Sequence, residues 1–379
     1  MESGLWQPAH SIDDYKFSFE FYLNSLAKIE VDASHHVMLR ARSWETASLT
    51  ESIFDYWHEN GRTYHAYHGG SYHFPNDEPE LERQSNQHYI IKILLDGRNY
   101  LAPLSHENPP RKILDIATGT GLWAIEMGDE FPHSTIIGTD LSPVQPGLVP
   151  PNVRFYVDDA WQDGPDWHNV DYIHFRTTVG CWDDMAGLIK KGFERLRPGG
   201  WMESQEPHIG VDCDEGPIPD DNGVKRWFTE MCELSVIAGR PLHITPMIKQ
   251  WYIDAGFVDV EEKVFKIPIN GWPRVTKLKR IGEMWRLNLT DGLSGLSYAL
   301  FHRVKGMKKE EIELALVDVR RDLADQRAQL YEKFSVVWGR KPGNSEEAVS
   351  SSILPPSQSP SHTKLGAHQA RCSGSGTIV

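Results

Sequence analysis

A short glycine-containing segment at residues 113–121 carries side chains suited to binding a small charged ligand. Its sequence, ILDIATGTG, is an apolar run that ends at Asp115 and is followed by Gly119 and Gly121. Glycines let a ligand approach the backbone and permit a tight turn, and the free amides at the start of a following helix are donors. The spacing Gly119-x-Gly121-x-x-Ala124 also fits the dinucleotide fingerprint, so this segment alone predicts a cofactor loop without choosing the cofactor.

Asp115 separates the two kinds of cofactor, because it ends the predicted strand. A carboxylate there would repel the pyrophosphate of a nicotinamide dinucleotide but can accept hydrogen bonds from a cationic group. S-adenosyl-L-methionine carries an ammonium group and a sulfonium and no phosphate. Asp115 therefore favours S-adenosyl-L-methionine, with Thr118, Gly119 and Gly121 of the same loop as further contacts. The alternative for Asp115 is a helix-capping or solvent-facing aspartate.

Two later acidic positions fit the adenosine half of such a cofactor. Asp140, followed by Leu141, ends the next predicted strand, and its two oxygens can accept both ribose hydroxyls. Asp158, Asp159 and Ala160 follow the third predicted strand, where a carboxylate can accept the exocyclic amine of adenine. We predict Asp159 rather than Asp158 for that contact. Turn and loop aspartates would look the same in sequence, which is the alternative at both places.

The elements that must position these residues alternate between short apolar runs and helical patterns. This order predicts a parallel sheet with right-handed crossovers, whose strands hold a ligand at their carboxyl ends. The predicted strands are 112–116, 135–138, 153–157, 170–175 and 201–204, and the helices between them are 122–131 and 185–196. Further predicted elements are helices 80–95, 224–238 and 245–255, a strand at 258–265 and a short return strand after Pro268.

One enlarged domain accounts for most of the chain. Residues 1–50 show weak periodicity and are interpreted as a weakly structured leader, and 51–340 as the domain, with helical additions at about 205–255 and 273–337. The last addition rests on an apolar stripe interpreted as a packing helix. The stripe consists of Ile312, Leu316, Val319, Leu323 and Leu330. Residues 341–379 are rich in Ser, Pro and Gly, which predicts a disordered tail.

Composition limits the partners and the compartment. The formal net charge of -14 repels nucleic-acid phosphates and anionic membranes. The chain lacks both a secretory signal pattern and an apolar run of about 18 residues, and its four cysteines have no short spacing. We therefore expect a cytoplasmic protein that binds neither nucleic acid nor a membrane. We also expect no metal, because the spacing of His65, His68 and His73 matches no ligand motif.

The region from Ile113 to Glu203 resembles the class I methyltransferase pattern and, in detail, the fungal LaeA-like methyltransferase family of secondary metabolism. The matching motifs are GRTYH at 61–65, PNDE at 75–78, LLDG at 94–97, GTGLWAI at 119–125, DLSPVQP at 140–146 and PGGW at 198–201. The resemblance covers roughly Ser52 to Pro342. It implies an α/β, Rossmann-like fold with a mostly parallel seven-stranded sheet, helices on both faces, and added N- and C-terminal helices.

The resemblance also implies S-adenosyl-L-methionine as the cofactor and a set of contacts to it. These contacts are Asp115, Gly119, Gly121, Asp140 and Asp159, with Tyr64 closing over the site from the N-terminal segment. The family usually has glycine at the position of Ala117. An alanine fits the turn there if its backbone dihedral φ is negative.

The acceptor side of the reaction is less defined by the sequence. Methyl transfer from a sulfonium is an in-line displacement, and a hydroxyl acceptor would benefit from a base whereas an amine or thiolate can do without one. His174, at the end of the fourth predicted strand, is the candidate catalytic base; the alternative is a hydrogen-bonded core histidine. Trp227, Met231, Met284 and Trp285 are candidates for an apolar substrate cavity or for ordinary packing.

We therefore expect a methyltransferase that acts on a small, apolar or aromatic acceptor in fungal secondary-metabolite biosynthesis. Two alternatives stay open. The first is a nuclear regulator of secondary metabolism with protein partners, which the resemblance to the LaeA-like family implies. The second is a cofactor-binding module without turnover, suggested by the departure at Ala117. No motif identifies the acceptor or the atom that is methylated.

Overall fold

The computed structural model describes residues 37–40, 46–48, 56–65, 72–159, 167–344 and 346. The chain divides into two units, Met1–Pro342 and Gly343–Val379. Almost all of the second unit lies outside the described residues, as does most of the predicted leader at 1–50, so both of those predictions stay predictions. The architecture below is that of the first unit.

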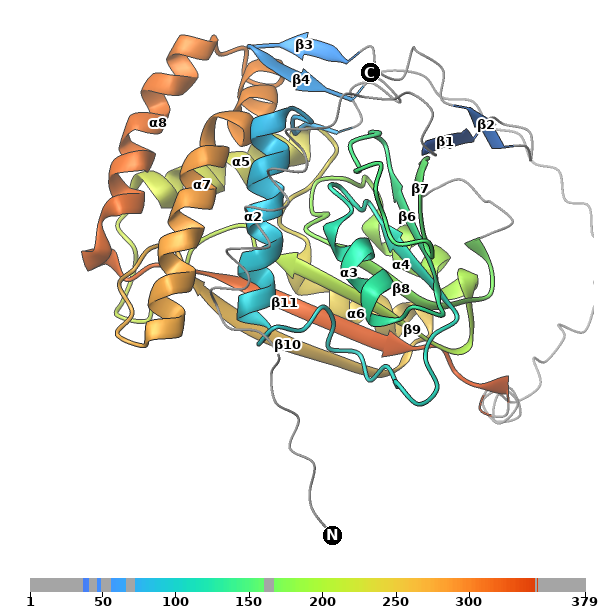
Figure 1. The fold of residues 1–379 in the computed structure, drawn as a ribbon. Helices are drawn as coiled ribbons and strands as arrows, with labels where there is room; N and C mark the ends of the chain where they lie inside the picture. Colours follow the sequence, from blue (N-terminus) through green and yellow to red (C-terminus); the bar gives the residue numbers. More distant parts are fainter. Residues whose placement is uncertain are drawn as a thin grey trace, which may run out of the picture. The chain divides into compact units, whose positions relative to one another are not determined.

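A nine-stranded sheet is formed within the described residues, in the order β10-β11-β9-β8-β5-β6-β7-β1-β2 (Figure 1). Its strands are β1 (Val37–Arg40), β2 (Thr46–Ser48), β5 (Lys112–Ile116), β6 (Thr135–Asp140), β7 (Val153–Val157), β8 (Val170–Arg176), β9 (Leu196–Pro207), β10 (Val258–Pro268) and β11 (Tyr331–Arg340). Neighbouring strands are parallel in the run β9-β8-β5-β6-β7 of this order. The strand β11 pairs antiparallel with both β9 and β10. The seven strands from β5 to β11 confirm the predicted mostly parallel sheet, to which β1 and β2 are additions.

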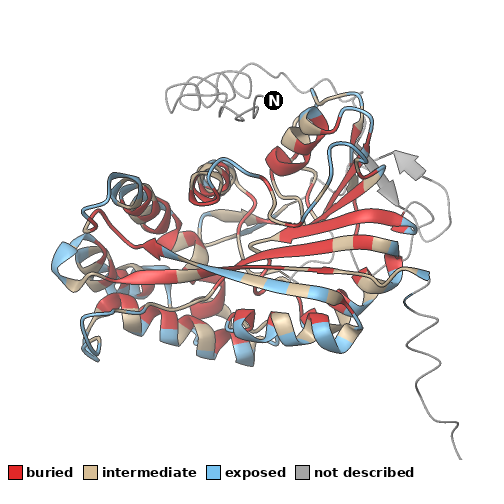
Figure 2. Ribbon diagram, turned by 90° about the horizontal axis from the view of Figure 1, so that it is seen from below, coloured by how far each residue is buried: buried red, intermediate tan, exposed pale blue. Residues whose placement is uncertain are grey.

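Helices cover both faces of this sheet, as predicted. They are α2 (Glu78–Leu94), α3 (Leu122–Glu130), α4 (Met185–Arg195), α5 (Gly223–Ile237), α6 (Ile248–Ala255), α7 (Thr276–Arg303) and α8 (Lys309–Ala324). Side chains alternate between the two faces along each strand, so Ile113 packs in a cluster with Trp123 of α3, whereas Leu114 packs in a different cluster with Leu188 of α4. Figure 2 shows the result, with the inner strands buried along most of their length, β10 largely exposed or half-buried, and helices exposed on their outer sides.

The predicted helical addition at 273–337 is wrong at its C-terminal end. Residues 331–340 form β11, the antiparallel strand between β9 and β10, and no return strand directly follows Pro268 among the described residues. Ile312 and Leu323 are buried on α8 as predicted, but Leu330 lies beyond that helix, just before β11. The segment is rich in aromatic and β-branched residues and is buried on both faces. It therefore lacks the alternation of apolar and polar residues that marks a half-exposed strand, and for this reason its periodicity suggested a helix.

A small hairpin ties the N-terminal region to α2. It consists of β3 (Trp57–Glu59) and β4 (Arg62–Tyr64). The guanidinium of Arg62 donates to both carboxylate oxygens of Asp77, each at 2.6 Å, and Asp77 is also the N-cap of α2. The hairpin therefore fixes the start of the helix, and α2 in turn packs along α7 and against α3. Among the described helices, none is long and apolar enough to cross a membrane.

Candidate functional site

The loop that joins β5 to α3 is held against the end of β6. The backbone N–H of Gly119 donates to Oδ2 of Asp140 at 2.8 Å, and the N–H of Thr118 donates to the carbonyl of Thr139 at 2.9 Å. Gly121 has a φ of 76°, and a Cβ at that position would lie 2.4 Å from the ring of Phe155. Gly121 thus permits the turn and the close packing beneath it, whereas Gly119 lies at the cavity surface.

The backbone of Ala117 does not have the negative φ at which an alanine was expected to fit this turn. Its φ is +54°, in the left-handed region that favours glycine. A residue with a side chain is strained there by roughly 1–2 kcal/mol. The turn therefore keeps the geometry that a glycine would adopt, and the alanine carries the strain.

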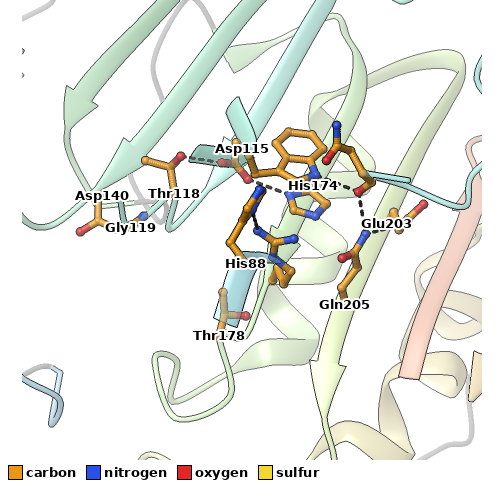
Figure 3. Close-up of polar contacts among 12 residues, drawn as sticks. His88, Asp115, Thr118, Gly119, Asp140, His174, Thr178, Glu203 and Gln205 are labelled. Carbon is orange, nitrogen blue, oxygen red and sulfur yellow. Dashed lines mark hydrogen bonds and ion pairs between the residues drawn. The ribbon is translucent and has the colours of Figure 1, made fainter. Parts of the chain in front are cut away.

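Asp115 lies at the centre of a buried polar group at the end of β5 (Figure 3). Its Oδ2 accepts a hydrogen bond from the hydroxyl of Thr118 at 2.5 Å, and its Oδ1 lies 2.8 Å from Nδ1 of His174. Asp115 and His174 are neighbours in the register of β5 and β8, and the imidazole stacks on the indole of Trp123 with a centroid distance of 3.7 Å. The three side chains hold one another in place.

His174 is neutral in this arrangement. Burial lowers the pKa of His174 to about 4, although the neighbouring Asp115 raises it. A neutral imidazole next to an ionised carboxylate donates its Nδ1–H, which leaves Nε2 without a proton, and Nε2 has no hydrogen-bond partner. Because the histidine is uncharged, the pair of Asp115 and His174 keeps a net negative charge.

Asp140 and its neighbours form the opposite side of the loop. Oδ1 of Asp140 accepts from the N–H of Ser142 at 3.0 Å, in addition to the bond from Gly119. Burial raises the pKa of Asp140 to about 6, against the effect of those backbone donors. Leu141 follows directly at the cavity wall. The carboxylate is thus held in a fixed orientation at the end of β6.

One cavity contains most of the side chains expected from the sequence. Its lining includes Asp115, Thr118, Gly119, Asp140, Leu141, Asp158 and His174. Asp158 lines it, whereas Asp159, the residue predicted for the adenine contact, does not. Tyr64 is also absent from the lining, and its ring packs under the guanidinium of Arg303 at 4.9 Å. His65 and Tyr72 line the cavity. Ala160 lies outside the described residues.

A second cavity adjoins the first, and four residues line both: Tyr72, Arg83, Gln87 and Thr177. Its remaining lining is mostly apolar and aromatic. It includes Phe74, Val179, Ile209, Trp227, Phe228, Met231, Leu242, Trp285 and Leu289, together with Glu80, Asn288 and Glu332. The candidates Trp227, Met231 and Trp285 are therefore brought together here, whereas Met284 does not line the cavity and packs against the core. His174 lines only the first cavity.

Sequence reasoning missed the polar residues of α2 and β11. Arg83 pairs with Glu80 through two hydrogen bonds of 2.9 and 2.6 Å, and it also donates to Gln87. Glu332 comes from the strand that was assigned to a helix. No motif marks these positions, because a helix that merely packs on the domain would show the same residue types.

The fold and the loop geometry now agree with the comparisons with known proteins. The family profile described as "Methyltransferase domain" matches residues 86–262. The chain is 38% identical to "Methyltransferase pytC" of Aspergillus terreus, over 78% of this chain and 91% of that protein. It is 34% identical to "Secondary metabolism regulator LAE1" of Cochliobolus heterostrophus, over 75% of this chain and 94% of that protein.

A more distant relative, "Protein-methionine methyltransferase laeA" of Emericella nidulans, is 28% identical over 75% of this chain and 76% of that protein. Fold, loop and family profile together define a class I methyltransferase that uses S-adenosyl-L-methionine. The chain belongs to the fungal LaeA-like family, whose members include the pytC methyltransferase and the LAE1 regulator. The resemblance noted in the sequence is confirmed.

Proposed function

We propose that this methyltransferase binds its cofactor in the first cavity and methylates a small apolar or aromatic acceptor bound in the second. The observation that carries this proposal is the shared wall of the two cavities at Tyr72, Arg83, Gln87 and Thr177. Two molecules bound on either side of such a junction can bring a donor and an acceptor into contact. The aromatic lining of the second cavity matches an apolar acceptor.

The residues of the first cavity fit the cofactor. The net negative charge of Asp115 and His174 suits the ammonium group of the methionine end, and Gly119 at the cavity surface leaves room beside it. In this proposal the carboxylate of Asp140 accepts the ribose hydroxyls. Asp158, rather than Asp159, is then the candidate for the adenine contact, since it lines the cavity. When bound, the cofactor supplies an electrophilic methyl group on a sulfonium.

His174 serves in this proposal as a positioning residue. It lies on Asp115 and Trp123, at the proposed methionine end, and it does not line the second cavity. The expected role as catalytic base would require His174 to reach the acceptor, and the absence of His174 from the lining of the second cavity favours the positioning role in this proposal. Positioning and exclusion of water then supply the rate enhancement.

Binding of S-adenosylhomocysteine measured by calorimetry tests the cofactor site. Asp115→Ala should weaken binding by at least about tenfold, because it removes a buried charge-assisted contact. The matched control is Asp129→Ala, an exposed aspartate on α3, which should bind as the wild type does. Equal affinities for all three proteins would refute the assigned site.

Turnover is tested by incubating the protein with isotope-labelled cofactor and a fungal metabolite extract. Label should enter the small-molecule fraction with the wild type and the Asp129→Ala variant but not with Asp115→Ala. If the protein binds S-adenosylhomocysteine and yet no extract yields a labelled small molecule, the small-molecule acceptor is wrong. A binding module without turnover would give that result.

A regulatory role in secondary metabolism is the second candidate, favoured by 34% identity to a protein named as a regulator. In that case the label would enter a protein, or no acceptor at all, and the tagged chain would enter the nucleus. The same labelled incubation, separated into protein and small-molecule fractions, therefore discriminates the two functions. Microscopy of the tagged protein that finds it only in the cytoplasm would contradict the regulatory role.

A further inference from the structure

We infer that Glu332 makes the second cavity selective for an apolar or aromatic acceptor that carries a protonated amine. This inference rests on the proposed function, because it takes the second cavity to be the acceptor site. The amine is a recognition group, and the inference does not require it to be the atom that is methylated.

Glu332 is buried without a cationic partner among the described residues. This residue lies on β11 with 2% of its surface exposed, and it lines the second cavity. The indole N–H of Trp285 donates to its Oε2. Its neighbour in the register of β10 is Ile267, which is apolar. A buried carboxyl group with one neutral donor and no cationic partner in the described part of the chain has unused capacity to bind a cation.

The other charged residues that line the same cavity are paired with each other. Glu80 and Arg83 of α2 form a bidentate pair and neutralise each other, and Asn288 of α7 accepts a further hydrogen bond from Arg83. The lining residues from α5 are Trp227, Phe228 and Met231, which are uncharged. The only carboxyl group left to compensate a ligand charge among these lining residues is that of Glu332.

Aromatic side chains make up much of the lining of the second cavity. Five of the lining residues are Tyr72, Phe74, Trp227, Phe228 and Trp285. Aromatic faces attract cations, most strongly where water is excluded. Rings combined with a carboxyl group are therefore complementary to an ammonium ion on an apolar body, whereas a ligand carboxylate would lose its hydration without finding a free cation.

The protonation state of Glu332 adds to this geometry. Burial raises its pKa to about 8, so the group is mostly protonated at neutral pH when no cation is nearby. An ammonium ion would stabilise the carboxylate, and binding would release the proton to solvent. The other ionisable groups of the cavity are Tyr72, whose pKa burial raises well above its ordinary value, and the paired Glu80 and Arg83. Tyr72 would therefore not release a proton near pH 7.

Three indole probes of similar size test the inference. They are tryptamine (cationic), 3-ethylindole (neutral) and indole-3-propionate (anionic), each titrated by calorimetry into the protein loaded with S-adenosylhomocysteine. We expect tryptamine to bind the most tightly, by on the order of tenfold over the neutral probe, as befits a buried charge-assisted hydrogen bond. Titration in two buffers of different ionisation enthalpy should reveal proton release with tryptamine only.

The variant Glu332→Gln keeps the side-chain shape and an acceptor for Trp285. It should lose both the preference for tryptamine and the proton release while binding 3-ethylindole as the wild type does. The matched control is Glu82→Gln, an exposed carboxylate on α2, which should change neither. Comparable affinities for all three probes, unaltered tryptamine binding by Glu332→Gln, or no binding of any probe would overturn the inference. Loss of S-adenosylhomocysteine binding would instead point to a failure of the proposed function.

Discussion

Ala117 carries backbone strain at the turn that lines the cofactor cavity. Its φ of +54° destabilises a residue with a side chain by roughly 1–2 kcal/mol. A glycine would remove this strain, but part of the gain would be offset because glycine has more conformational freedom in the unfolded chain. Ala117→Gly should therefore raise the free energy of unfolding by up to about 1 kcal/mol. Thermal unfolding monitored by circular dichroism measures the change.

The control for this substitution is Ala124→Gly in the interior of α3. That change should destabilise the protein by about 1 kcal/mol or more, because glycine is unfavourable in a helix and a buried methyl group is lost. If both variants were destabilised alike, the strain at Ala117 would be refuted.

Asp140 should make cofactor binding depend on pH. Its pKa is raised to about 6, and hydrogen bonds from ribose hydroxyls favour its ionised form. The affinity for S-adenosylhomocysteine should therefore fall as the pH drops from about 8 through about 6 to about 5. Asp140→Asn should bind weakly throughout and lose most of this dependence, whereas the control Asp129→Asn should follow the wild type. A flat wild-type profile in calorimetry would contradict the assigned contact.

Individual residues were predictable where their place followed from a strand end. Asp115, Gly119 and Asp140 could be located from sequence, because the carboxyl ends of adjacent parallel strands meet at one edge of the sheet. The choice between Asp158 and Asp159 could not, since successive residues point in opposite directions and the strand's exact end decides which one faces the cavity.

At the scale of elements, the stable placement of α2 depends on its junction with the N-terminal hairpin. Asp77 accepts two hydrogen bonds from Arg62 and caps the helix through the N–H of Glu80. Asp77→Ala should lower the free energy of unfolding by about 1–2 kcal/mol, since it removes the cap and leaves a half-buried guanidinium unpaired. Asp77→Asn keeps a capping oxygen and should cost less.

Denaturant unfolding with urea measures both variants against Glu78→Ala, an exposed neighbour in the first turn of α2. The control should stay within about 0.5 kcal/mol of the wild type. A loss for Asp77→Ala no larger than that of the control would show that the hairpin contributes nothing to the stability of α2.

Elements were predictable in proportion to the regularity of their pattern. The strands β5 and β7 were predicted residue for residue, because short apolar runs bounded by turns mark them. The strand β11 was not, and Glu332 was missed with it. Its partners β9 and β10 are far from it in the sequence, so only tertiary pairing distinguishes this strand from a buried helix.

At the scale of the whole molecule, both cavities are assembled from segments that are distant in sequence. The second cavity combines α2, α5, α7 and β11, and none of these elements carries a motif for an acceptor. The class of enzyme could be read from one loop and three strand ends, which local sequence determines. The acceptor site could not, since its composition depends on how added helices pack beside the sheet.

Buried ionisable groups should also give the molecule a stability maximum at acidic pH. Burial lowers the pKa of His73 and of His174 to about 4, so these two side chains bind more protons in the unfolded chain, and their contribution to stability rises as the pH increases from about 4 to about 6.5. Burial raises the pKa of Glu203 and of Glu206 to about 7. For these carboxyl groups, and for Glu332, the folded state binds more protons.

The stability contributed by these three carboxyl groups is fully present below about pH 4.5 and is lost as the pH rises through about 7–8. Between about pH 4.5 and 6.5 the three carboxyl groups outweigh the two histidines, so the free energy of unfolding should peak near about pH 4.5 and decline above it. Glu332→Gln should make the decline of the free energy of unfolding with pH less steep, by up to the slope that corresponds to one proton, because an amide does not titrate. Urea unfolding across this pH range, with Glu82→Gln as the control, measures both slopes. A wild-type stability that keeps rising to about pH 8, with the same slope in Glu332→Gln, would mean that the buried carboxyl groups do not govern stability at neutral pH.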